Sequence, residues 1–259
     1  MKYYIKILIV LLTVSACQES KKKVNDDDFI FLEDSNYTID SYNGISVYRD
    51  GDTKEVMNGY YVVGNEYGKS EEFRVINGVL NGPNITYSND NRMYSKSIYV
   101  DGRQQGEELT YYPSGELKKK TNYTNGKRVG KEIVYFESGQ VRTESKIENE
   151  DIVESISFDI VGNITSQMFI KDSRTITQQI SNGKITYEHI DSNYDNFDAM
   201  KFFNDKGELE KFIQMYNDGV DTFLIELDAN EKEIKRINPK KEPEKMLEYQ
   251  KYFGRLQKF

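Results

Sequence analysis

Glycines recur at a nearly fixed spacing through the middle of this 259-residue chain, and this periodicity constrains its fold more than any other feature. Gly115, Gly139 and Gly162 each follow an aromatic residue by four positions and precede an aliphatic residue by two. A repeat of about 24 residues is typical of an array of small, similar units. Because each unit of such an array packs only on its neighbours, we expect function on an extended surface rather than in one buried pocket.

A second set of turn residues lies half a period away, at Asn77-Gly78, Asp101-Gly102 and Asn125-Gly126. Such pairs between alternating apolar runs indicate hairpins, because the turn needs positive φ angles that Asn, Asp and Gly tolerate. Each half-period is therefore predicted to be one strand and one turn. We predict an all-β fold, in which residues 29–238 form an array of antiparallel hairpins and one elongated, meandering sheet.

The repeat extends in both directions from these copies. Asn91 occupies the glycine position upstream, Gly183 and Gly207 continue the series downstream, and Glu150 stands where the second set would have a glycine. The step is shorter between Gly162 and Gly183. The glycines predicted to lie at structural turns are Gly78, Gly102, Gly115, Gly126, Gly139, Gly162 and Gly207.

Three segments of the repeat resemble a known family. Residues 111–117 (Tyr-Tyr-Pro-Ser-Gly-Glu-Leu), 123–130 and 135–141 are similar to the bacterial MORN-like repeat, in the variant found in antitoxin-component proteins. The similarity runs from about Asn77 to Ile164 and is weaker from there to about Asp228. The resemblance implies a hairpin fold and a non-enzymatic binding protein, such as the immunity partner of a toxin. It supplies no catalytic residue.

The N-terminus has the features of a bacterial lipoprotein signal peptide. Two lysines accompany an apolar stretch from Ile5 to Leu12, which is too short to span a bilayer, and Val14-Ser15-Ala16-Cys17 follows. This pattern resembles a lipobox, so residues 1–16 are predicted to be removed and Cys17 to be lipidated, for example with palmitate. An ordinary signal peptide or a buried free cysteine are the alternatives. Residues 17–28 then form a tether, and Gln18 after the cysteine predicts the outer membrane.

Composition excludes some partners. The formal net charge is −8 and falls to −10 without residues 1–16, which contain two lysines and no acidic residue. An acidic surface disfavours nucleic acid and suits a basic protein surface. The chain also contains 20 tyrosines, which suits a thin sheet with one face in solvent.

No catalytic constellation is recognisable. His189 is the only histidine, and Cys17 the only cysteine, so the usual zinc and nucleophilic sites lack their residues. A carboxylate pair such as Asp195 and Asp198 is uninformative where acids are so abundant. The run from Asp26 to Asp28 lacks the spacing of a calcium loop. We therefore expect no enzymatic activity, no metal and no cofactor.

Residues 239–259 differ from the repeats. Pro239 and Pro243 end the strand pattern, and a helix is predicted from about Glu244 to Gln257. Its apolar residues, at helical spacing, are Met246, Tyr249, Phe253 and Leu256. A partner or a membrane could bind this face, but a cap on the last exposed strand fits the end of a repeat array better.

These features predict an envelope lipoprotein, anchored in the membrane by its lipid, whose sheet binds a protein partner, as an immunity-type protein would. The alternative is a structural or glycan-contacting envelope protein. Tyr112 and Phe136 are the candidate binding residues, because they are expected on the face opposite to a buried aromatic row. That row, predicted to lie in the core, consists of Tyr87, Tyr111, Tyr135 and Phe158.

Overall fold

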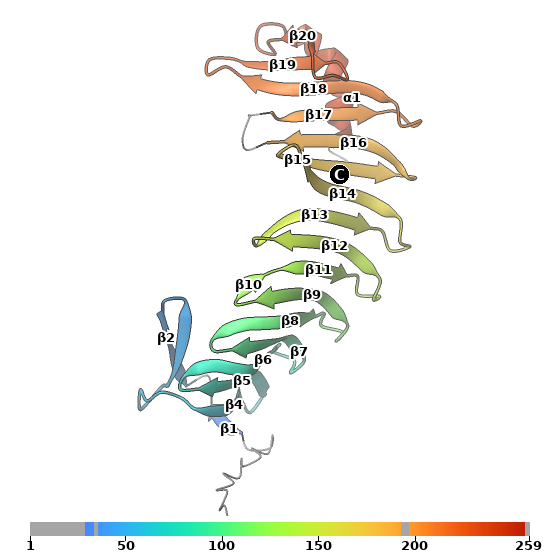
Figure 1. Cartoon of the computed structure of the whole chain (residues 1–259). Coiled ribbons are helices and arrows are strands. Elements are labelled where there is room, and N and C mark those ends of the chain that lie inside the picture. Colours follow the sequence, from blue (N-terminus) through green and yellow to red (C-terminus); the bar gives the residue numbers. More distant parts are fainter. Residues whose placement is uncertain (1–28, 34–35, 193–196, 257–259) are drawn as a thin grey trace, which may run out of the picture.

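The computed structural model describes residues 29–33, 36–192 and 197–256. These residues form one open sheet of 20 strands that follow one another along the sheet almost in chain order (Figure 1). Nearly all neighbouring strands are antiparallel, which confirms the predicted meander of hairpins. The strands are β1 (Ile30–Glu33), β2 (Tyr37–Tyr42), β3 (Ile45–Asp50), β4 (Gly59–Asn65), β5 (Gly68–Ile76), β6 (Val79–Tyr87), β7 (Met93–Val100), β8 (Arg103–Tyr111), β9 (Leu117–Thr124), β10 (Lys127–Arg128), β11 (Gly130–Tyr135), β12 (Val141–Glu148), β13 (Asp151–Phe158), β14 (Ile164–Lys171), β15 (Arg174–Ser181), β16 (Lys184–Asp191), β17 (Ala199–Phe203), β18 (Leu209–Asn217), β19 (Thr222–Leu227) and β20 (Glu233–Ile237).

Most turns along one edge of the sheet share one geometry. In the turn after β8, Tyr112 donates its N–H to the carbonyl of Glu116 at 2.8 Å and accepts one from Gly115 at 2.9 Å. The same pair of bonds recurs in five other turns at this edge. One residue of each turn has a φ between +61° and +93°, and these residues are Asn91, Gly115, Gly139, Gly162, Gly207 and Glu231.

Two-residue turns dominate the opposite edge. In Asn77-Gly78, Asp101-Gly102 and Asn125-Gly126 both residues have positive φ, as does the pair Asn149-Glu150. Glu150, at φ +72°, therefore adopts a left-handed conformation that costs a residue with a Cβ about 1–2 kcal/mol. All seven glycines predicted at structural turns have positive φ.

Gly183 differs from its prediction. It lies at the same edge as Gly162 and Gly207, but in a two-residue turn with Asn182 that joins β15 to β16. It is therefore not equivalent to those glycines. The shorter turn explains why the repeat shortens between Gly162 and Gly183.

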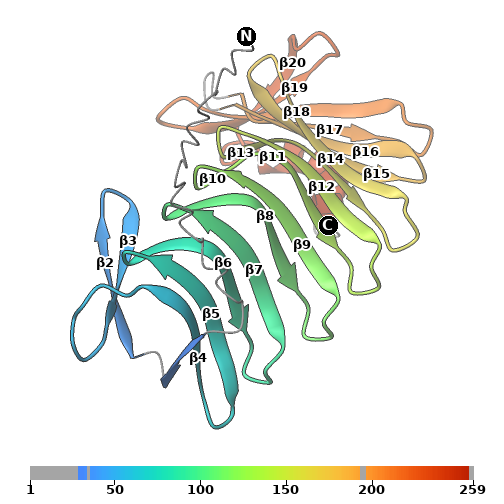
Figure 2. The same cartoon turned by 60° about the horizontal axis from the view of Figure 1, so that its bottom comes forward.

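A β-bulge repeats with the turns. The register shifts by one residue just before each of these six turns, and the pairs that close these strands are Tyr87 with Met93, Tyr111 with Leu117, Tyr135 with Val141, Phe158 with Ile164, Phe203 with Leu209, and Leu227 with Glu233. Bulges add local twist and bend to a strand. Regular repetition of the bulge is consistent with the curvature of the whole sheet in Figure 2.

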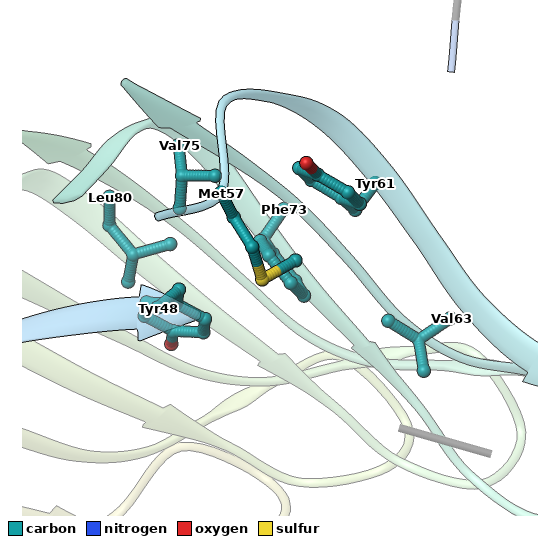
Figure 3. Close-up of a cluster of buried hydrophobic side chains, with 7 residues drawn as sticks. All are labelled: Tyr48, Met57, Tyr61, Val63, Phe73, Val75 and Leu80. Carbon is teal, nitrogen blue, oxygen red and sulfur yellow. The ribbon is translucent and has the colours of Figure 1, made fainter. Parts of the chain in front are cut away.

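The first strands depart from the meander. β1 pairs with β4 in parallel, and the hairpin β2–β3 stands away from the sheet, with one register pair between Val47 and Val79 joining it to β6 (Figure 2). The hairpin covers one face of β4–β6. There, Tyr37 and Tyr48 lie 5.4 and 4.9 Å from the ring centroid of Phe73. Figure 3 shows the resulting buried cluster of Tyr48, Met57, Tyr61, Val63, Phe73, Val75 and Leu80.

The C-terminal segment covers the same face at the other end. Instead of the single predicted helix from Glu244 to Gln257, a 3-10 helix (η1, Pro243–Tyr249) leads into a short α-helix (α1, Gln250–Leu256). These helices cover the face of the sheet rather than the edge of its last strand. Their side chains complete a buried cluster that contains Met200, Phe202, Ile213, Leu224, Ile237, Tyr249 and Tyr252. Met246 and Phe253 pack against this cluster as predicted, and Tyr252 was not predicted.

The sheet therefore has two distinct faces. We call the face under the hairpin and the helices the capped face, and the opposite one the open face. Between its two caps the capped face is mainly polar and hydrogen-bonded within itself. Thr121, fully buried, donates to Glu132 at 2.8 Å, and Ser145 donates to Ser155 at 3.1 Å.

Candidate interaction surface

One row of side chains runs along the open face across fourteen strands, from β4 to β18. Register partners on antiparallel strands point to the same face, so the row follows from the pairing. Its members are Val62, Glu72, Ile85, Lys96, Leu109, Lys120, Ile133, Glu144, Ile156, Gln167, Gln178, Glu188, Lys201 and Phe212. Val62 lies between Tyr61 and Val63 of one capped cluster, and Phe212 directly precedes Ile213 of the other. Because neighbouring residues of a strand point to opposite faces, the row lies on the face opposite to the caps.

Burial divides this row into three parts. Glu72 at one end and Gln178, Glu188 and Phe212 at the other are each less than 9% exposed. From β6 to β14 every member is half-buried or exposed, although apolar and charged residues alternate there. The middle of the open face therefore presents isoleucine and leucine to solvent with no segment of the described chain covering them.

The aromatic row predicted in the core lies on this open face. Tyr111 and Tyr135 are two positions beyond Leu109 and Ile133 in the same strands, so their side chains point to the same side. Tyr87, Tyr111, Tyr135 and Phe158 are all half-buried, and none belongs to a buried cluster. The prediction of a core role was wrong, because two buried clusters formed beneath the caps and the third formed at the C-terminal end of the open face.

Tyr112 and Phe136, the predicted binding residues, begin equivalent turns and are half-buried. The hydroxyl of Tyr112 donates to the carbonyl of Tyr135 in the next repeat at 2.7 Å. The ammonium of Lys118 lies 5.6 Å from the Tyr112 ring. Tyr112 thus links two repeats, and its role in binding stays a prediction, as does that of Phe136.

A buried carboxylate closes the N-terminal end of the exposed row. Glu72 accepts hydrogen bonds from Tyr60, from Tyr87 at 2.6 Å and from Lys69 at 2.8 Å. Burial raises the pKa of the Glu72 carboxyl, but these donors outweigh it and the net pKa is lowered. The carboxylate is fully engaged, so it acts as a structural anchor of β4–β6.

A chain of hydrogen bonds closes the C-terminal end. Gln167 donates to Gln178, Gln178 donates to Glu188, and Lys201 donates to the other oxygen of Glu188 at 2.9 Å. Beyond it lies a third buried cluster, formed by Ile190, Ala199, Phe212, Ile225 and Leu227. The side chains of the open face are therefore buried at this end as well.

Catalytic features are sparse among the described residues. His189 on β16 does have a carboxylate partner, since its Nε2 lies 2.6 Å from Asp198 Oδ1, but both side chains are more than a third exposed. No group of three or more His, Cys, Asp or Glu residues in the described part of the chain could hold a metal ion. Nor does that part include a helix long and apolar enough to cross a membrane. Cys17, Gln18, Asp26 to Asp28 and Asp195 lie outside the described residues.

Comparison with known proteins gives no relative: the chain matches no family model and no curated protein.

Proposed function

We propose that the protein is a non-enzymatic binding protein and that the open face of β6–β14 is its contact surface for a protein partner. The observation that supports this is the exposed row from Ile85 to Gln167, in which aliphatic and charged side chains alternate on strands held in fixed register. A rigid surface of this kind loses little conformational entropy on binding. An apolar centre with aromatic residues, bordered by a polar rim, is typical of protein interfaces.

Two of the sequence-based predictions remain part of the proposal. Anchoring by a lipid on Cys17 would hold the sheet at the membrane of the cell envelope, expected to be the outer membrane. The resemblance to MORN-like antitoxin components makes a toxin one class of partner. The glycan-contacting alternative has less support, because the tyrosine rings of the open face are only half exposed and Lys69 lies 5.6 Å from the ring of Tyr87.

Site-specific photocrosslinking in the native host tests the surface. A crosslinking residue at Ile133 or Ile156 on the open face is expected to give the same protein adduct, whereas one at Thr143 or Ser157 on the capped face is expected to give none. Leu109→Glu together with Ile133→Glu should remove the adduct formed from position 156, because two carboxylates would replace the apolar side chains and would have to be desolvated in the interface. Adducts formed only from the capped face, or formed equally from both faces, would contradict the proposal.

A further inference from the structure

Several cations on the open face have no ion pair within the described part of the chain, and three of them lie close to Leu109 and Ile133 in the strand register. Lys96 on β7, Lys118 on β9 and Arg142 on β12 are all exposed. Lys96 belongs to the exposed row itself. Lys118 and Arg142 occupy equivalent positions in successive repeats, each at the bulge beside a turn. Lys96 is the register partner of Leu109, and Lys118 and Arg142 lie two residues from the register partners of Ile133, so the three cations flank the same part of the row.

Apart from Asp151, the acidic residues of β8–β13 on this face are already paired. Glu107 pairs with Lys120, and Glu144 with Lys131 at 2.9 Å. Lys146 lies 2.8 Å from Glu148 and 3.7 Å from Glu154. On β7–β9 and β11–β13 the cations of this face outnumber its acidic residues by two: the cations are Lys96, Arg103, Lys118, Lys120, Lys131, Arg142 and Lys146, and the acids are Glu107, Glu144, Glu148, Asp151 and Glu154.

We infer that the partner binds through an acidic surface, whose carboxylates meet Lys96, Lys118 and Arg142 around the apolar residues of the row. This inference rests on the proposed function. The net charge of the chain, −8, favours a basic partner by itself. At physiological ionic strength, however, charges more than about 8 Å apart are largely screened, so the local cations decide which surface can approach.

A charge-matched pair of peptides tests this directly. A fluorescent peptide of alternating Leu and Glu is titrated against the full chain, beside a peptide in which every Glu is replaced by Lys. The acidic peptide is expected to bind more tightly, and its affinity should fall between about 50 and about 300 mM salt. The triple variant Lys96→Glu, Lys118→Glu and Arg142→Glu is expected to weaken its binding by about tenfold or more.

The control carries the same change of net charge elsewhere. Lys54, Lys206 and Lys232 are exposed and lie in the β3–β4, β17–β18 and β19–β20 connections, outside the proposed contact surface, and reversing these three should leave the affinity nearly unchanged. Equal weakening by both triple variants, tighter binding of the basic peptide, or no binding of the acidic peptide would overturn the inference. If photocrosslinks still map to the open face in that case, the proposed function stands and only the acidic chemistry of the partner is wrong. If the acidic peptide binds as expected but no photocrosslink forms, the proposed function fails, while binding of acidic groups by Lys96, Lys118 and Arg142 stands.

Discussion

The ends and the middle of the sheet are built from the same hairpin but are stabilised differently. At both ends a segment outside the repeat packs on the capped face and buries aromatic residues, with Phe73 under the hairpin β2–β3 and Phe202 under the C-terminal helices. Between them, described strands such as β9 and β12 have only their neighbours to pack on. A repeat without a cap therefore keeps its shape through register, turns and polar pairs, whereas hydrophobic burial is concentrated at the two ends of the sheet.

Truncation of a capped aromatic residue should have the largest effect. Phe202 is fully buried, and its ring lies 5.4 Å from Tyr187 and 5.1 Å from Tyr252. Phe202→Ala is expected to lower the free energy of unfolding by about 3–5 kcal/mol. Ile133→Ala in the half-buried middle should lower it by only about 1 kcal/mol. Urea titration followed by circular dichroism compares the two, and similar losses would show that the middle has a core that burial does not reveal.

A pair of matched glycines separates the cap from the turn. Gly78 and Gly126 have nearly equal φ angles, +77° and +79°. A Cβ at Gly78 would lie 2.7 Å from Val56 Cγ1 and 2.8 Å from Val47 Cγ1, whereas at Gly126 it would meet nothing within 4 Å. Gly126→Ala should therefore cost about 1–2 kcal/mol of unfolding free energy through backbone strain alone. Gly78→Ala should cost about 1–3 kcal/mol more through overpacking against the hairpin.

Hydrogen exchange distinguishes the two ways in which Gly78→Ala can be accommodated. If the hairpin β2–β3 stays packed on the sheet in Gly78→Ala, the amides of the hairpin and those of β4–β6 should lose protection together. Gly126→Ala should lower protection only in its own turn and in the two adjoining strands. Equal costs for the two variants would show that β2–β3 does not press on the sheet.

The sequence predicts the middle of this protein better than its ends, and the reason is physical. Turn residues such as Gly115 and Asn125 fix backbone conformation locally, so their spacing predicts strands, turns and register. Packing of Tyr48 on Phe73, or of Tyr252 on Phe202, depends on segments that return to the sheet from outside the repeat, and no local pattern encodes that. The same limit explains the wrong core prediction for Tyr87 and its equivalents, because periodicity shows which residues share a face but not which face becomes covered.

Acid should loosen the C-terminal cap before it affects the middle. Hydrogen bonds from Lys235 and Lys211, at 2.8 and 3.0 Å, lower the pKa of the Glu248 carboxyl to about 2. A carboxyl with a lowered folded-state pKa contributes stability above its ordinary pKa of 4.5, and this contribution is lost as pH falls toward about 2. Because the side chain is 46% exposed, we expect this contribution to be no more than about 1 kcal/mol.

Hydrogen exchange measures this effect. The exchange rates of the η1 and α1 amides, relative to those of the β9 amides, should rise in the native chain as pH falls through this range. In Glu248→Gln that part of the pH dependence should be absent, and an unchanged profile would contradict the assignment.

The smallest expected effect is a gain of stability in the middle. Glu150 is left-handed at φ +72° where the preceding repeat has Gly126, so Glu150→Gly should relieve about 1–2 kcal/mol of strain. Two terms oppose this gain. Glycine loses about 0.5–1 kcal/mol more backbone entropy on folding, and the exposed ion pair of Glu150 with Lys127, at 3.5 Å, contributes a few tenths of a kcal/mol at most. The net gain should therefore be roughly 0.5 kcal/mol.

The reciprocal change, Gly126→Glu, places the same residue in the same conformation one repeat earlier and should cost a similar amount. Thermal melts of the two variants measure both, and a loss of stability in Glu150→Gly would show that contacts of the Glu150 side chain outweigh the strain of its backbone.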